Sequence, residues 1–73
     1  MAGVLPHERF AQNLRRLRLK SDLSQEALGD ACGLHRTEIS LLERAAREPR
    51  LSTIVKLARA LRVELAELLA GIR

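Results

Sequence analysis

The chain has 73 residues, enough for one small domain, and its single cysteine excludes a disulfide bond within the chain. Its 13 basic and 9 acidic residues give a net charge of +4 and a pI near 10.6, which favours a nucleic acid partner but also fits an ordinary charged surface. One cysteine and two histidines are too few for a metal cage, and no apolar run approaches the roughly 20 residues that span a bilayer. Because the N-terminus also lacks the basic start of a signal peptide, we expect a cytoplasmic protein without metal or other cofactor.

Abundant Leu, Ala, Arg and Glu, with almost no β-branched runs, predict an all-α protein. The first predicted helix begins at Pro6, a residue suited to the first helical position, and ends near Lys20. Its apolar face is formed, at three- and four-residue spacing, by Phe10, Leu14 and Leu17. Cations crowd its last turns, beginning with Arg15. They either complement the negative end of the helix dipole or contact phosphate, and the residues alone leave both interpretations open.

A second helix is predicted between Ser24, a favourable N-cap, and Gly33, a favourable left-handed terminator. Gly29 in its middle costs about 1 kcal/mol relative to alanine, so we expect another backbone segment to approach closely there. Cys32 is expected to be a small apolar filler between helices.

A third short helix is predicted from His35 to about Arg44, with Ile39 and Leu42 as its apolar edge. Only Gly33 and Leu34 separate it from the preceding helix. Two short helices joined so tightly form a helix-turn-helix geometry, in which the second helix can enter a DNA major groove.

A fourth helix is predicted after a polar loop, with Ser52 as its N-cap and an apolar face of Ile54, Leu57, Ala58 and Leu61. A fifth helix is expected over residues 64–72. Its large apolar residues are Leu65, Leu68, Leu69 and Ile72. They are too many for one side of so short a helix, so we expect part of this stripe to form a two-fold interface with a second copy of the chain.

Several segments resemble the lambda-repressor/Cro-type helix-turn-helix family at matching spacings. They are LSQEALGDACG (residues 23–33), LHRTEISLLER (34–44), the pattern from Pro49 to Val63, and ELAELL (64–69). The HRTxIS start of the third helix (35–40) is also similar to the controller proteins of bacterial restriction–modification systems. The resemblance implies a compact five-helix domain over residues 1–73, with the helix-turn-helix in its second and third helices. We expect residues 1–5 to be flexible.

The resemblance also implies roles for individual residues. The base-reading positions of the third helix correspond to Arg36 and Thr37, and its remaining candidates are Ser40, Glu38 and Leu41. Arginine can bind guanine O6 and N7 together, a threonine methyl can meet the thymine methyl, and a glutamate can accept from cytosine N4. A solvent-exposed helix face is the alternative for these side chains. The phosphate-contact candidates are Gln25, Ser24, His35, Arg47, Arg44 and Arg15.

Other matched positions are structural. Arg18 and Glu43 correspond to an ion pair between the first and third helices. The sequence departs from the family at Asp22, Ala45 and Arg62, which occupy positions where glycine is usual and a left-handed backbone is expected.

The sequence therefore predicts a DNA-binding transcriptional regulator that binds an inverted-repeat operator as a homodimer, with RNA polymerase as a further candidate partner. Control of restriction–modification genes follows from the narrower resemblance. An antitoxin or adaptor that uses the same fold to bind a protein is the alternative, although little of the sequence lies outside the expected helices. An enzyme is disfavoured because no nucleophile–base pair is recognisable, and no small-molecule ligand is predicted.

Overall fold

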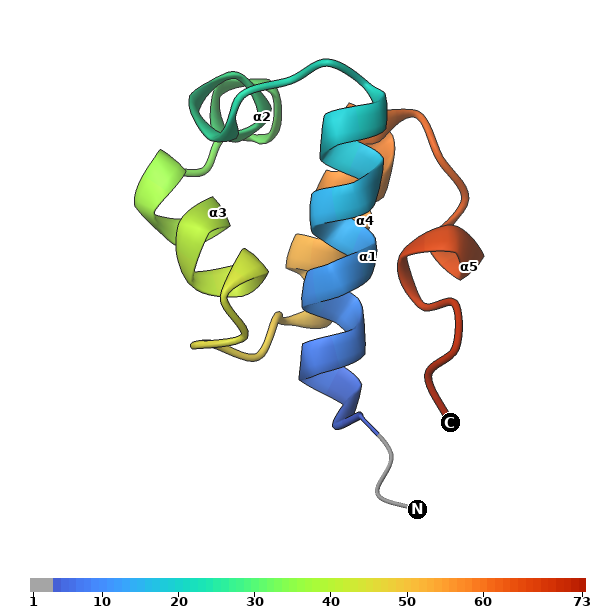
Figure 1. The fold of residues 1–73 in the computed structure, drawn as a ribbon. Coiled ribbons are helices and arrows are strands. Elements are labelled where there is room, and N and C mark those ends of the chain that lie inside the picture. The colour runs from blue at the N-terminus through green and yellow to red at the C-terminus, as the bar shows by residue number, and fades with distance from the viewer. Residues whose placement is uncertain (1–3) are drawn as a thin grey trace.

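The computed structural model describes residues 4–73, which form five helices and no strand (Figure 1). The helices are α1 (Pro6–Lys20), α2 (Gln25–Cys32), α3 (Arg36–Glu43), α4 (Leu51–Leu61) and α5 (Leu65–Leu68). In the view of Figure 1, α4 lies behind α1, α2 and α3 lie to one side of this pair, and α5 lies to the other. The predicted all-α, five-helix architecture is confirmed. The prediction that residues 1–5 are flexible concerns mainly residues 1–3, which lie outside the described part of the chain.

One apolar core joins all five helices. Each helix contributes residues that are buried almost completely: Phe10, Leu14, Leu17, Leu28, Ile39, Leu42, Leu57, Leu61 and Leu68. Cys32 packs against this cluster at its edge, and its thiol donates to the Leu28 carbonyl oxygen at 3.1 Å. Burial raises the pKa of the Cys32 thiol. Within residues 4–73, no helix is long and apolar enough to cross a membrane.

Local side-chain chemistry sets the ends of the short helices. The Ser24 hydroxyl accepts the Ala27 backbone N–H at 2.9 Å and so caps α2, whose last turn is closed by Gly33 with φ of 74°. The fourth helix differs from the prediction, because it begins at Leu51 with Arg50 as its N-cap. The Arg50 carbonyl already accepts the Ile54 N–H at 3.0 Å, so Ser52 lies inside the helix and does not cap it.

The close approach expected at Gly29 is present between α2 and the turn that follows it. A Cβ atom at Gly29 would overlap the Leu34 carbonyl oxygen and lie 3.4 Å from the Arg36 nitrogen. The Gly29 carbonyl in turn accepts the Leu34 N–H at 2.8 Å. Glycine therefore lets the turn before α3 lie directly against the backbone of α2.

Among residues 4–73, three residues other than glycine have a left-handed backbone. Asp22, Ala45 and Arg62 have φ of 58°, 57° and 57°, at the three positions where the resemblance implies glycine. Each Cβ in this region costs on the order of 1 kcal/mol, so these turns keep the expected left-handed backbone at some expense in stability.

The last helix is shorter than predicted. α5 ends at Leu68, and the chain then turns through Gly71, whose φ is 79°. The Asn13 amide of α1 donates to the carbonyl oxygens of Leu68 and Ala70, both at 2.8 Å. The Asn13 side chain thus binds carbonyl groups that the short helix leaves without a helical partner, and Ile72 packs against the core.

Gly29→Ala tests the contact between α2 and α3. Although alanine is the better helix former, the displaced backbone should lower the free energy of unfolding by about 1–3 kcal/mol. Urea denaturation measures this change. Asp30→Ala, at the exposed neighbouring position, is the control and should cause no such loss. Equal or greater stability of Gly29→Ala would contradict the close contact.

Candidate nucleic-acid interface

The outward face of α3 carries polar side chains at the start of the helix. Arg36 and Thr37 are exposed and Ser40 is partly exposed, whereas Ile39 and Leu42 on the inner side are fully buried. The apolar pair attaches α3 to the core, and the polar residues remain accessible to a partner.

A hollow of about 250 Å³ lies between α2 and α3 on this face. Its lining residues are Gln25, Arg36, Thr37 and Ser40. Gln25 is the first residue of α2, where unpaired N–H groups and the positive end of the helix dipole favour anions. The structure therefore brings predicted base-contacting and phosphate-contacting residues together from two helices.

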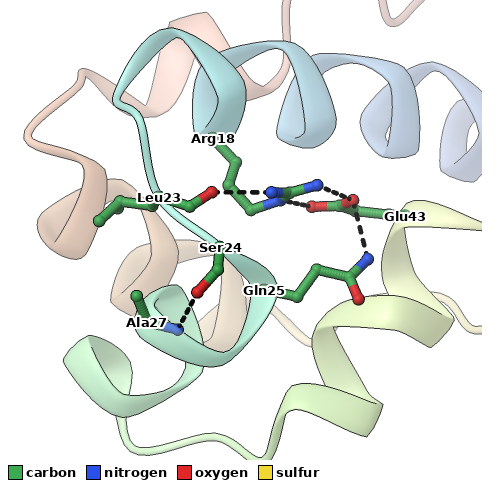
Figure 2. A network of polar contacts seen from close by, with 6 residues as sticks. All are labelled: Arg18, Leu23, Ser24, Gln25, Ala27 and Glu43. Atoms are coloured by element: carbon green, nitrogen blue, oxygen red, sulfur yellow. Dashed lines mark hydrogen bonds and ion pairs between the residues drawn. The ribbon is translucent and has the colours of Figure 1, made fainter.

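A buried ion pair holds the other end of α3 against α1. The Arg18 guanidinium lies between the Leu23 carbonyl and the Glu43 carboxylate (Figure 2). Arg18 donates to both carboxylate oxygens, through Nε to Oε2 and through Nη2 to Oε1 at 3.0 Å, and Nη1 donates to the Leu23 carbonyl oxygen at 2.7 Å. Both side chains are less than a tenth exposed. The hydrogen bonds that Arg18 donates to Glu43 raise the pKa of Arg18, and the expected ion pair is present.

Gln25 extends this pair toward the hollow. Its amide Nε2 donates to Glu43 Oε1 at 3.2 Å (Figure 2), which fixes the side chain of the first residue of α2 relative to the last residue of α3. The amide retains a second N–H and its carbonyl oxygen for other partners.

Two further phosphate candidates serve as N-caps. Ser24 caps α2, and His35 caps α3 by accepting the Thr37 N–H at Nδ1 over 3.0 Å. This hydrogen bond requires an unprotonated Nδ1, which leaves Nε2 of the exposed His35 ring as a donor.

The other predicted contact residues are more dispersed. Arg44 donates from Nε to the Ser40 hydroxyl at 3.3 Å, and Leu41 is partly exposed beside them on α3. Arg47, in the loop after α3, forms an ion pair with Glu38. Arg15 is exposed on α1 and does not line the hollow.

The predicted dimer surface is smaller than expected. Leu68 is completely buried inside the chain, so its assignment to an interface is wrong, and Ile72 packs against the same core. Leu65 and Leu69 are 40% and 37% exposed. Leu69 also lines an apolar hollow of about 270 Å³ with Ile72, Phe10, Ile54, Pro6, Pro49, His7 and Glu48.

Comparison with known proteins decides the family. The sequence model of the helix-turn-helix family matches residues 14–68, which include α2, α3 and the turn between them. The chain belongs to the helix-turn-helix family. Control protein C.BamHI of Bacillus amyloliquefaciens is 48% identical to this helix-turn-helix protein over 61 residues, covering 82% of the chain and 75% of the relative. The family relationship identifies the chain as a DNA-binding regulator of transcription.

Solved structures agree with this assignment. The restriction-modification controller protein C.AhdI from Aeromonas hydrophila is 44% identical, with a TM-score of 0.82 over 85% of this chain and 94% of that one. The P22 c2 repressor protein, in complex with a synthetic operator, is 30% identical, with a TM-score of 0.79 over 94% of this chain and 98% of that one. The predicted resemblance to repressors and to controller proteins is confirmed.

Several contacts of this helix-turn-helix protein were not predicted. The Gln25–Glu43 hydrogen bond and the Glu38–Arg47 ion pair join residues separated by a turn or loop, where sequence spacing carries no signal. Asn13 could have been noticed, because it is a polar residue next to Leu14 on the buried face of α1. The two carbonyl groups that its amide binds could not have been predicted.

Glu43→Ala tests the buried pair. The substitution leaves the Arg18 charge buried without its carboxylate, so the free energy of unfolding should fall by about 3 kcal/mol and Tm by at least about 10 °C. Thermal unfolding followed by circular dichroism measures the change. Glu48→Ala, at an exposed carboxylate, is the control. An unchanged Tm for Glu43→Ala would show that the pair contributes nothing to stability.

Proposed function

We propose that the chain binds an inverted-repeat operator as a homodimer and controls the genes of a restriction–modification system. The hollow that combines Gln25 with Arg36, Thr37 and Ser40 is the observation that carries this proposal. The relatives named as a control protein and a restriction-modification controller support the regulated genes. The dimer acts in the cytoplasm on nucleoid DNA, where it blocks RNA polymerase or recruits it.

Base reading is assigned to the outward face of α3. Arg36 binds guanine O6 and N7, and the Thr37 methyl group meets a thymine methyl. Ser40 lies one turn beyond Arg36 on the same face and reaches the next base edge or a phosphate. Leu41 supplies an apolar contact and Glu38 an acceptor at the flank. Support comes from the exposure of Arg36 and Thr37 at the first turn of a helix whose inner side is fixed in the core.

Phosphate binding is assigned to the helix ends and the loop. Gln25 and Ser24 present the positive end of α2 to one phosphate, and the free Nε2–H of His35 donates to a neighbouring one. Arg44 and Arg47 add cations beyond α3. Arg15 on α1 acts only as a peripheral charge, since it lies outside the hollow.

Dimerisation is assigned to the exposed part of α5. Leu65, Leu69 and the apolar hollow beside Leu69 form a surface that a second copy can cover. One small module buries only about 600–1,000 Å² on DNA, so pairing two of them raises both affinity and specificity. A two-fold axis places the recognition helices at half-sites about one helical turn, roughly 34 Å, apart.

In vitro selection from random duplexes tests the function directly. The enriched sequences should contain an imperfect inverted repeat, and footprinting should protect both halves. Failure to enrich any duplex would contradict the proposal, whereas a single asymmetric site would contradict only the dimeric arrangement.

Arg36→Ala should weaken binding to the selected operator by about 1–3 kcal/mol and relax specificity at one base pair of each half-site. The physical reason is the loss of a bidentate contact to one guanine. Competition binding with single-base variants of the operator measures both effects. Arg59→Ala removes the same charge from α4 and is the control. An equal loss on operator and random DNA would contradict base reading by Arg36.

Leu69→Glu should produce monomers, because it places a carboxylate in an apolar surface that the dimer buries. Sedimentation velocity measures the mass, and circular dichroism confirms that the helices remain. Leu51→Glu makes the same change at a leucine that is 74% exposed on α4 and should leave the dimer intact. A dimeric Leu69→Glu variant would move the interface away from α5.

A further inference from the structure

Glu38 and Arg47 were both assigned to DNA, yet in the structure they bind each other. Arg47 Nη1 donates to Glu38 Oε1, and the side chains of Glu38 and Arg47 are 25% and 55% exposed. The pair links α3 to the loop that follows it. In the free protein, therefore, neither charge is available to another partner without cost.

The pair lies at the flank of the recognition helix. Glu38 comes two residues after Arg36. Because a helix turns roughly 100° per residue, the two side chains leave α3 about 200° apart. Glu38 therefore lines a different hollow, of about 450 Å³, between α3, the loop and the start of α4. The other side chains around this hollow are Leu34, Glu48, Arg50, Ser52, Thr53 and Lys56.

The other charges around this hollow explain what the ion pair with Glu38 does to Arg47. Arg50 and Lys56 share the hollow and add positive charge, so without Glu38 this flank would present several free cations to a polyanion. The Glu38 carboxylate neutralises the cation in the loop nearest α3. A partly exposed ion pair of this kind is weak, so a competing partner can exchange it.

We propose that the Glu38–Arg47 ion pair is a specificity switch in which Glu38 withholds Arg47 from DNA phosphates until a cognate base replaces it. The inference rests on the proposed DNA-binding function. On a non-cognate duplex Glu38 retains Arg47, and one phosphate contact is not made. On the operator, the amino group of a cytosine donates to Glu38, and Arg47 is released to the backbone.

Such an exchange favours the operator over other DNA. A phosphate contact carries no sequence information, so a permanently free arginine would strengthen binding to every duplex alike. Because the genome offers a large excess of non-specific sites, that gain would reduce the fraction of protein on its operator. When Arg47 contacts a phosphate only after Glu38 has met its cognate base, non-specific duplexes gain no affinity and the protein stays on its operator.

The test is a double-mutant cycle of Glu38→Gln and Arg47→Gln, with binding measured on the selected operator and on a random duplex from 50 to 200 mM salt. Glu38→Gln should bind the random duplex about five-fold more tightly, with a salt slope steeper by about 0.9. The operator affinity should be unchanged or weaker. The gain on random DNA should disappear in the double variant, since it depends on Arg47.

Asp30→Asn is the charge control, because Asp30 is an exposed carboxylate on α2 that lines neither this hollow nor the one assigned to the dimer. A gain for Glu38→Gln that persists without Arg47, or that Asp30→Asn reproduces, would reduce the effect to charge repulsion and overturn the switch. Equal gains on both duplexes would also overturn it. A wild-type protein that selects no duplex overturns the proposed function itself, whereas one that selects an operator but fails the cycle overturns only the switch.

Discussion

The Arg18 guanidinium between the Glu43 carboxylate and the Leu23 carbonyl determines where α3 lies. The pair ties the end of α3 to α1, and through Gln25 it also fixes the start of α2. In a chain this small, a single core supplies only about 3–5 kcal/mol, so one misplaced buried charge would offset much of it. The pair is therefore a strong constraint on geometry whether or not its net contribution to stability is large.

The turns between the helices also hold the fold in place, partly at a cost in stability. Gly29 lets α2 and α3 meet backbone to backbone, and the left-handed backbones of Ala45 and Arg62 are accepted at some cost. Ala45 precedes the loop that carries Arg47, and Arg62 directs the chain from α4 toward α5. Besides Asp22 between α1 and α2, strain is thus located at the two turns that orient the loop beside α3 and the exposed leucines of α5.

Much of the fold could be predicted from residues whose type strongly favours one local backbone structure. Ser24, Gly29 and Gly33 determined α2 and its turn because capping, close approach and a positive φ each have few residue solutions. The prediction that Ser52 caps α4 was wrong, because the Arg50 carbonyl already accepts the first helical hydrogen bond. The length of α5 and the burial of Leu68 could not be predicted, since the end of α5 is bound by Asn13 and Leu68 packs in a core built from all five helices, both far away in the sequence. On the candidate interface, the pattern named the candidate contact residues but not that Glu38 and Arg47 bind each other.

The amide of Asn13 also has a consequence for the order of events during folding. A single helical turn has no stability of its own, so α5 can persist only after α1 has formed and presents that amide to its carbonyl groups. The leucines displayed on α5 are then among the last features of the chain to take shape. In the proposed dimer, an incompletely folded chain would therefore lack the α5 surface, and only folded molecules would associate.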